Sequence, residues 1–187
     1  MKAYNFNPFP ELFSDRLKLR KFESSDDAQI LKFRSDPTVM KYLDRPLIQN
    51  IEEATILIQK ITSDLETNAG ITWGITKKEN DALLGTIGFW KMYPEHARAE
   101  IGYMLHTDFH GKGFMQEALS TVIHFGFTAL ELHSIEANVN PGNDSSIKLL
   151  EKNGFAREGY FRENYFFNGK FIDSAIYSLI NPVDAIH

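Results

Sequence analysis

The sequence contains no cysteine in its 187 residues. This absence excludes disulfides, a thiolate nucleophile and thiolate metal ligands, and it is compatible with a reducing compartment. Long apolar runs are also missing, because no stretch approaches the roughly 20 residues that a membrane helix needs. The N-terminus, MKAYNFNPFPELF, lacks the apolar core and small-residue cleavage site of a signal peptide. We therefore expect a cytoplasmic protein that does not bind a membrane.

Positive charge is not in excess either, since 25 Asp and Glu stand against 20 Lys and Arg, a formal net charge of -5. Duplex nucleic acid is bound largely by Lys and Arg that neutralise phosphates, so a nucleic-acid partner is not expected. Apolar residues make up 43% of the chain and aromatic residues 13%, which is ample for a packed core. The length predicts a single domain over residues 1–187, with residues 1–14 as an N-terminal arm.

The hydrophobic pattern predicts a mixture of strands and helices. Helices are expected after Ser25, Asn50, Gly113 and Asp144, and a further helical turn includes Met40. Hairpins near both ends of the chain and a strand–helix–strand crossover between them indicate a mixed sheet with helices packed on it, of class α+β or α/β. The apolar and polar alternation places the strands near residues 16–22, 72–76, 83–90, 98–106, 134–140, 157–167 and 171–180.

Two glycines, Gly111 and Gly113, lie with Lys112 between a predicted strand and a predicted helix. The first N–H groups of a helix have no intrahelical partner and carry the positive end of its dipole, and glycine lets a phosphate approach the backbone closely. The segment is therefore a candidate pyrophosphate site, with a plain tight turn as an equal alternative. A nucleotide site is disfavoured, because the Walker A pattern is absent and the pattern GxGxxG fails at Gln116.

This segment, HGKGFM at residues 110–115, resembles the acetyl-CoA loop of the GCN5-related N-acetyltransferase (GNAT) superfamily. It is most similar to the branch that acetylates the N-termini of ribosomal proteins. Gly113 matches the central glycine of the signature Arg/Gln-x-x-Gly-x-Gly/Ala, whereas His110 and Met115 replace its first and last residues. The stretches RLKLRKF, SDPTVMKYL, LLGTIGFW and AEIGY also resemble this branch, as do the Asn-x-x-Ser and Gly-Phe elements within residues 140–155.

The resemblance implies a GNAT fold with a central, mixed, mostly antiparallel twisted sheet of about six to seven strands. Helices flank this sheet, which is splayed between its fourth and fifth strands. The implied reaction is direct transfer of the acetyl group of acetyl-CoA to a primary amine, with the N-terminal amine of a ribosomal or other protein as one acceptor. Acetyl-CoA is thus the expected co-substrate, and its expected binding residues are Met104, Leu105, His106, His110, Gly111, Lys112, Gly113, Phe114, Met115, Asn143 and Ser146.

Glu100 is the candidate general base, acting through water, because an amine acceptor is mostly protonated at pH 7 and must lose a proton. An equally weighted alternative is a structural carboxylate paired with Arg98. The strand 98–106 is expected to separate from the following strand. The acyl chain would lie in that gap, where the backbone N–H near Met104 or Leu105 would polarise the thioester oxygen.

Ser146 and Asn143 complete the candidate catalytic set. The resemblance implies that Ser146 protonates the leaving thiolate and that Asn143 orients the pantetheine or its water. Each residue also has a structural interpretation, because a serine is common in the first turn of a helix that Asn143 or Asp144 caps.

Four residues are candidates for the acceptor pocket. Asp173 and Tyr177 occupy positions of the last strand where the family often has Asp and Tyr, although ordinary strand packing is the preferred interpretation. Trp73 and Trp90 are candidates for lining the acceptor groove, but large aromatic residues in strands usually lie in the core, so we favour the core for both.

His106 and His110 are four residues apart, but the segment between them is not helical and no third ligand is near, so no metal is expected. Two other functions compete with an N-acetyltransferase of protein N-termini. One is an acyl-CoA-binding sensor of the same fold, and the other is an acetyltransferase of small molecules such as polyamines or antibiotics. The chain is expected to be a monomer or a homodimer.

Overall fold

The computed structural model describes residues 4–182, which form one twisted sheet of eight strands. The spatial order is β1-β2-β3-β4-β5-β6-β8-β7. All neighbouring strands are antiparallel except β5 and β6, which are parallel. The strands are β1 (Leu12–Phe13), β2 (Leu17–Arg20), β3 (Ile71–Lys77), β4 (Asn80–Tyr93), β5 (Arg98–Leu105), β6 (Ser134–Val139), β7 (Ala156–Phe167) and β8 (Lys170–Ile180).

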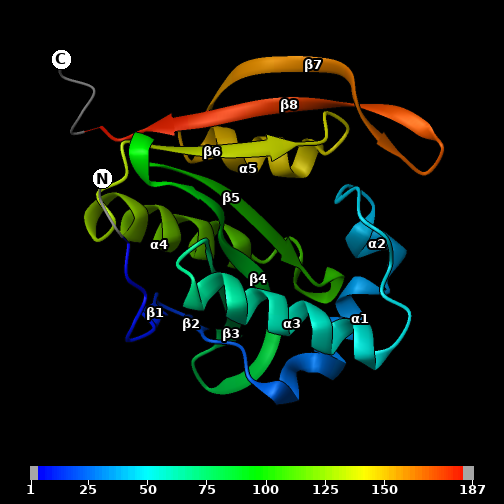
Figure 1. Ribbon diagram of the computed structural model, residues 1–187, viewed down its shortest axis with the longest axis vertical. Helices are drawn as coiled ribbons and strands as arrows, with labels where there is room; N and C mark the ends of the chain where they lie inside the picture. Colours follow the sequence, from blue (N-terminus) through cyan, green and yellow to red (C-terminus); the bar gives the residue numbers. More distant parts are fainter. Residues whose placement is uncertain (1–3, 183–187) are drawn as a thin grey trace.

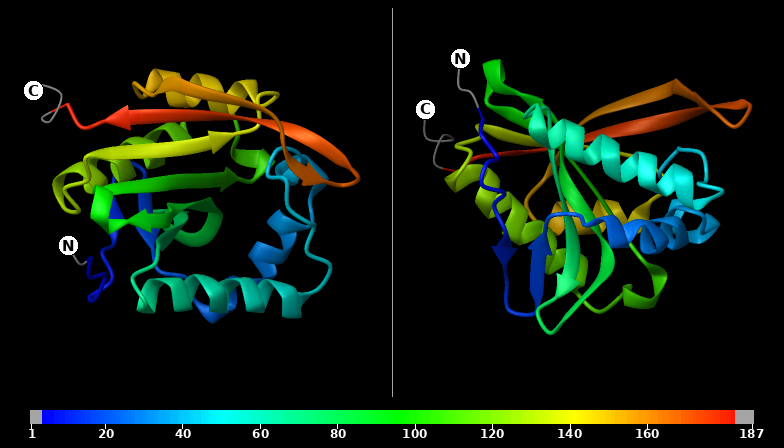
Figure 2. Two further views of the ribbon diagram at one scale, coloured as in Figure 1. Left: turned by 45° about the horizontal axis from the view of Figure 1, so that its top comes forward. Right: turned by 60° about the horizontal axis from the view of Figure 1, so that its bottom comes forward.

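Five α-helices of the described chain cover the two faces of the sheet (Figure 1). The helices are α1 (Asp27–Arg34), α2 (Pro37–Met40), α3 (Ile51–Glu66), α4 (Phe114–Thr128) and α5 (Asp144–Lys152). Helices α1 to α3 lie on one face and α4 and α5 on the other, as the views in Figure 2 show. Within residues 4–182, no helix combines the length and the hydrophobicity that a membrane crossing requires.

The sheet opens between β5 and β6. These strands pair only at three positions, Arg98 with Ser134, Ala99 with Ile135 and Glu100 with Glu136, because they diverge beyond that point (Figure 1). This confirms the expected splay between the strands near residues 98–106 and 134–140. The sheet has eight strands rather than six or seven, since residues 12–13 of the expected arm pair with β2.

A hydrophobic core lies on each side of the sheet. The larger core packs α4 and α5 against the strands, and the smaller core packs α1 and α3 against the opposite face. Trp73 is fully buried in the larger core and donates a hydrogen bond from Nε1 to the carbonyl of Pro10 at 2.7 Å, so the expected core position of Trp73 is confirmed.

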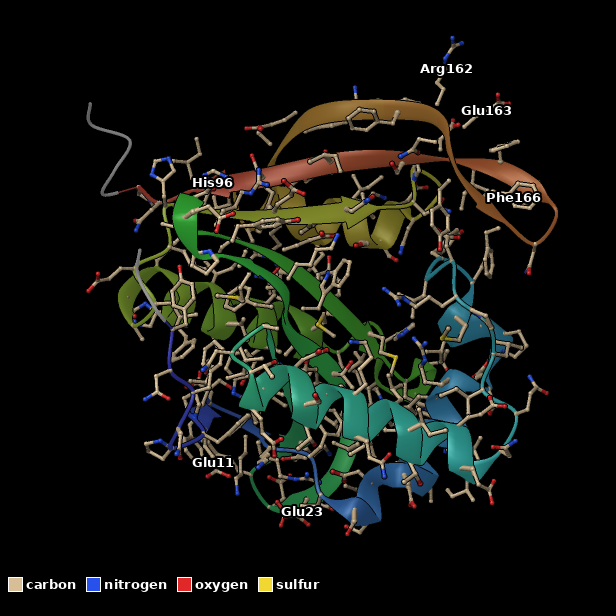
Figure 3. All side chains as sticks on the ribbon, viewed as in Figure 1. Glu11, Glu23, His96, Arg162, Glu163 and Phe166 are labelled. Carbon is tan, nitrogen blue, oxygen red and sulfur yellow. The ribbon has the colours of Figure 1, made fainter. Side chains whose placement is uncertain are left out.

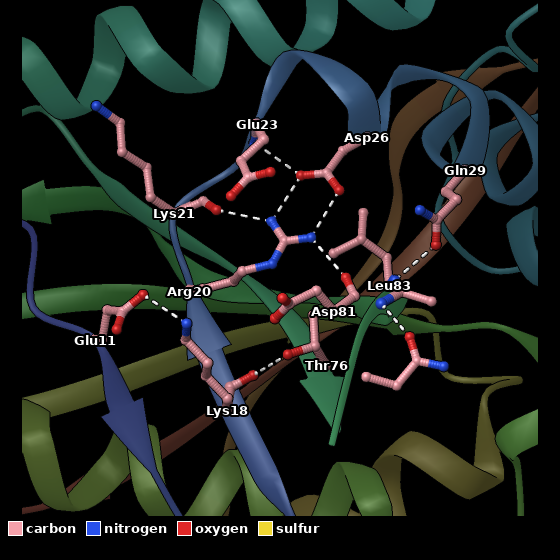
Figure 4. A network of polar contacts seen from close by, with 12 residues as sticks. Glu11, Lys18, Arg20, Lys21, Glu23, Asp26, Gln29, Thr76, Asp81 and Leu83 are labelled. Carbon is pink, nitrogen blue, oxygen red and sulfur yellow. Dashed lines mark hydrogen bonds and ion pairs between the residues drawn. The ribbon is translucent and has the colours of Figure 1, made fainter. Parts of the chain in front are cut away.

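A buried ion pair anchors α1 to the sheet (Figure 4). The Arg20 guanidinium donates two hydrogen bonds of 2.8 Å to the Asp26 carboxylate, and two further ones to the carbonyls of Lys21 and Asp81. Removing one partner of such a pair typically costs about 3–5 kcal/mol, because the other charge stays buried. The pair therefore joins β2, the residue before α1 and the start of β4 into one unit.

Local signals set the ends of several elements as the sequence predicts. Asn50 caps α3 by accepting a hydrogen bond from the Glu53 N–H at 3.0 Å. Asn168 and Gly169 have φ values of 48° and 77° in the turn between β7 and β8, as a two-residue hairpin turn requires. This hairpin extends past the body of the molecule, and Arg162, Glu163 and Phe166 point outward from it (Figure 3).

Candidate functional site

The turn before α4 presents a row of unpaired main-chain N–H groups. The amides of Phe109 and His110 donate to carbonyls within the turn, and the first helical bond runs from the Glu117 N–H to the Gly113 carbonyl at 3.1 Å. In the part of the chain that the structure describes, the N–H groups of residues 111–115 have no acceptor. Gly113 has a φ of 78° and begins a helix of 15 residues, so the donors coincide with the positive end of a helix dipole.

Arg16 places a second positive charge at this turn, a feature that the sequence analysis did not identify. Its Nη1 donates to the Lys112 carbonyl at 3.0 Å and its Nε to a Glu117 carboxylate oxygen at 2.7 Å. The guanidinium also lies 4.5 Å from the centre of the Phe114 ring. Arg16 is 96 residues from Lys112 in sequence, so no local pattern could have revealed this contact.

The open edge of β5 lies next to the turn. The His106 N–H donates to the Leu84 carbonyl at 2.9 Å, and Met104 stands opposite Thr86 in the same ladder. Because main-chain polar groups alternate along a strand, the Met104 N–H faces β4, whereas those of Tyr103 and Leu105 face the gap beside β6. Of the two amides that were expected to polarise a bound thioester, that of Leu105 therefore faces the gap, as does that of Tyr103, and that of Met104 does not.

The two histidines of this region have structural contacts. His106 is buried, and its Nδ1 accepts a hydrogen bond from the Asp108 N–H at 3.3 Å. A ring nitrogen of His110, Nε2, lies 2.9 Å from the Leu105 carbonyl oxygen. Both rings thus help to hold the turn against the end of β5.

Tyr103 and Ser146 meet across the gap between β5 and α5. The Tyr103 hydroxyl lies 2.7 Å from the Ser146 hydroxyl, and burial raises the pKa of Tyr103 to about 12. The Asn143 side chain accepts a hydrogen bond from the Ser146 N–H at 3.2 Å and caps α5. Asn143 thus has its expected capping role, and Ser146 has a second hydroxyl beside it that the sequence analysis did not predict.

On the α1–α3 face, a cavity of about 510 Å³ opens against the same stretch of β5. Trp90 lines this cavity and is 40% exposed, so its expected core position is wrong. Asp173 also lines the cavity, whereas Tyr177 is buried in the larger core. The cavity wall further includes Tyr42, Gly102, Met104, Asn138, Tyr165 and Ser174.

Glu100 is a buried carboxylate in this cavity, with only 6% of its surface exposed. Burial raises its pKa, and this effect is partly offset by Lys91, whose Nζ lies 3.5 Å from a Glu100 oxygen. The proposed pairing of Glu100 with Arg98 is wrong, because Arg98 pairs with Glu136 at 3.5 Å. A carboxylate with a raised pKa in a cavity has the properties of a proton acceptor.

The sequence of the chain matches a known family over most of its length. The model described as "Acetyltransferase (GNAT) domain" matches residues 16–156. The uncharacterized N-acetyltransferase p20 of Bacillus licheniformis is 41% identical over 170 residues, which are 90% of this chain and 95% of p20. The chain belongs to the GNAT acetyltransferase family. Its resemblance to that family, expected from residues 110–115, is thereby confirmed.

Solved GNAT structures share the fold of this chain. A GNAT-family acetyltransferase from Bacillus anthracis superimposes with a TM-score of 0.81 at 28% identity, covering 91% of this chain and 98% of the other. The ribosomal L7/L12 alpha-N-protein acetyltransferase RimL, in complex with coenzyme A, superimposes with a TM-score of 0.84 at 20% identity, covering 91% and 98%. The second comparison shows a shared fold, and it leaves the acceptor of this GNAT protein open.

The predicted site residues of this GNAT chain fall into two groups on opposite sides of the splayed strand β5. The turn groups His106, His110 and residues 111–115 near the β5 edge, with the Tyr103–Ser146 pair across the gap. Glu100 instead faces the cavity on the α1–α3 side. Strand β5 therefore connects a donor-rich turn with the cavity that holds the Glu100 carboxylate.

Proposed function

We propose that the protein binds acetyl-CoA with its diphosphate on the main-chain N–H groups of residues 111–115 and transfers the acetyl group to a primary amine. The observation that carries this proposal is the row of N–H groups without an acceptor at the start of α4. Helix N-termini of this kind bind phosphate because the donors and the dipole act together. Arg16, Lys112 and the ring of Phe114 would surround the same anion.

The thioester would lie in the gap beside β5. The N–H groups of Tyr103 and Leu105 face this gap, and β6 does not pair with them. A main-chain donor aimed at the thioester oxygen stabilises the negative charge that develops there during attack, which is a large catalytic effect in acyl transfer. No covalent intermediate on the protein is needed, and the sequence has no cysteine that would form one.

Glu100 would accept the proton of the incoming amine. Burial shifts the pKa of Glu100 upward, in the direction of neutral pH. A general base is most effective when its pKa lies near the operating pH. Glu100 lies three residues before Tyr103, which is about 10 Å along an extended strand. A water molecule between the amine and the carboxylate is therefore part of the proposal.

The Tyr103–Ser146 pair would receive the leaving thiolate. A thiol with a pKa of about 8.5 is a stronger acid than a tyrosine whose pKa is about 12. Full proton transfer from Tyr103 to the thiolate would therefore cost about 5 kcal/mol. The pair would instead donate a hydrogen bond that stabilises the thiolate, with Ser146 as the hydroxyl that contacts the sulfur.

The acceptor amine would enter from the cavity on the α1–α3 face, opposite the cofactor turn. Its volume of about 510 Å³ falls in the range of small-molecule sites, which favours a small amine over a folded protein. The N-terminal residue of a flexible protein segment is the second candidate acceptor.

The test measures thiol release from acetyl-CoA with a panel of peptides, amino acids and polyamines, together with CoA affinity by calorimetry. We expect CoA to bind and at least one amine to be acetylated. Binding without turnover over the whole panel would instead indicate an acyl-CoA sensor. Competition of ATP with CoA at equal affinity would indicate a general nucleotide site and contradict the proposal.

A further inference from the structure

Two arginine side chains line the cavity. Arg34 is the last residue of α1, Arg45 lies in the segment between α2 and α3, and both line the cavity. Within residues 4–182, neither guanidinium takes part in an ion pair or a hydrogen bond. Arg34 is half-buried and Arg45 is exposed. By contrast, the buried Arg20 pairs with Asp26 and the half-buried Arg98 pairs with Glu136.

Without a bound anion, the partly buried charge of Arg34 raises the free energy of the folded protein. Arg34 is half-buried, and its Nε is completely buried without a hydrogen-bond partner. Burial and the like charge of Arg45 lower the pKa of Arg34 to about 10. The C-terminal end of α1 favours one cation, but it does not account for a second guanidinium nearby. An unpaired charge in such a place is normally compensated by an anion.

The same cavity holds the proposed base. Arg45 lies over the ring of Trp90, 5.5 Å from its centre. Burial raises the pKa of Glu100, and the charge of Arg45 offsets a small part of that rise. The arginines and Glu100 therefore line the same open cavity. A molecule that fills about 510 Å³ would reach both.

The carboxylates of the cavity do not supply the missing partner. Glu100 pairs with Lys91 at 3.5 Å, and Asp173 accepts a hydrogen bond from the Tyr160 hydroxyl. Asp44 also lines the cavity; burial raises its pKa, and a hydrogen bond from Asn140 and the charge of Lys170 partly offset that rise. In the part of the chain that the structure describes, no ion pair joins Asp44 to either arginine, so the guanidinium groups of Arg34 and Arg45 are left without an anionic partner.

We propose that the acceptor is a small primary amine that also carries an anionic group, a carboxylate or a phosphate, which Arg34 and Arg45 bind while the amine approaches Glu100. This inference rests on the proposed acetyl transfer and narrows its substrate class. A polyamine would place a second ammonium group beside two guanidinium groups, so it fits this end of the cavity poorly.

Four amines of nearly equal length test whether the acceptor carries a carboxylate, a phosphate, a neutral group or a second ammonium group. They are 4-aminobutyrate, 3-aminopropyl phosphate, 4-amino-1-butanol and 1,4-diaminobutane. We expect kcat/KM for at least one of the two anionic amines to exceed that of the alcohol and the diamine by about 10- to 100-fold, as for charge-assisted hydrogen bonds. The better of the two identifies the anionic group. Equal or higher kcat/KM for the diamine would overturn the inference.

The substitutions Arg34→Gln and Arg45→Gln should each reduce this preference by about tenfold or more while CoA affinity stays unchanged. Arg162 is an exposed arginine on the β7–β8 hairpin (Figure 3). The control substitution Arg162→Gln should change neither the preference for anionic amines nor the CoA affinity. A uniform loss of activity toward all four amines would contradict the anion site.

Calorimetry separates this inference from the proposed function. Inorganic phosphate and 4-aminobutyrate are titrated into the CoA-bound protein and into the Arg45→Gln variant. If Arg45→Gln weakens the binding of phosphate or 4-aminobutyrate, the anion site is supported. If, in addition, no amine is acetylated, only the transfer reaction is refuted. Acetylation of the diamine without any anion binding refutes only the anion site.

Discussion

Gly113 and Gly169 form a matched pair that tests the phosphate turn. Their φ values, 78° and 77°, are nearly the same, so a side chain causes similar backbone strain at either position. Gly113 begins α4 beside the unpaired N–H groups, whereas Gly169 lies in the β7–β8 turn with no atom within 4 Å of an added Cβ. The variants Gly113→Trp and Gly169→Trp thus differ mainly in what the indole covers.

The backbone strain and the loss of CoA binding are expected to differ in size. A left-handed conformation costs an L-residue about 1–2 kcal/mol, so each variant should lose about 2–8 °C in Tm. At Gly113 the added Cβ also comes within 3.4 Å of the Arg16 Nη2, and the indole would lie over the donors. The loss of one or more charge-assisted hydrogen bonds should weaken CoA binding by about 10- to 100-fold.

Thermal unfolding and titration calorimetry with CoA give both quantities for the same samples. We expect equal losses of Tm in the two variants, and weaker CoA binding only for Gly113→Trp. The reasoning is refuted if both variants bind CoA as tightly as the wild type, or if both lose affinity to the same extent.

Three further substitutions test the remaining roles. Glu100→Gln should lower kcat by about 100-fold or more and remove the fall of kcat at low pH. In the wild type, that fall follows protonation of the base through its raised pKa; an unchanged pH–rate profile would exclude Glu100 as the base. Tyr103→Phe should lower kcat about tenfold at constant KM for acetyl-CoA, whereas Tyr93→Phe at the end of β4, outside the cavity lining, should have no effect; equal effects would argue against a role at the leaving thiolate. Arg16→Gln should raise KM for acetyl-CoA about tenfold and reduce its salt dependence, whereas Lys60→Gln on the exposed face of α3 should leave both unchanged; an unaltered KM in Arg16→Gln would remove this residue from the phosphate site.

The sequence predicts the parts of this fold that local chemistry determines. Asn50 and Asn143 cap their helices, and Asn168–Gly169 forms the hairpin turn, because each signal acts within a few residues. The two-residue strand β1 was not predicted, because a segment that short has no measurable periodicity.

Contacts between distant segments could not be predicted in the same way. Tyr103 and Ser146 are 43 residues apart, and their hydroxyls meet only because β5 and β6 diverge. Trp90 lies in a strand, and its sequence position therefore predicts a core residue. In the structure it is 40% exposed and lines the cavity. Arg98 and Glu100 are near in sequence, but each takes a partner from another strand.

A crystal structure of the protein with bound acetyl-CoA tests the central claim most directly. We predict diphosphate oxygens at about 2.9 Å from N–H groups of residues 111–115, with the thioester oxygen facing the amide of Tyr103 or Leu105. A diphosphate bound elsewhere, with the turn before α4 left empty, would contradict the account.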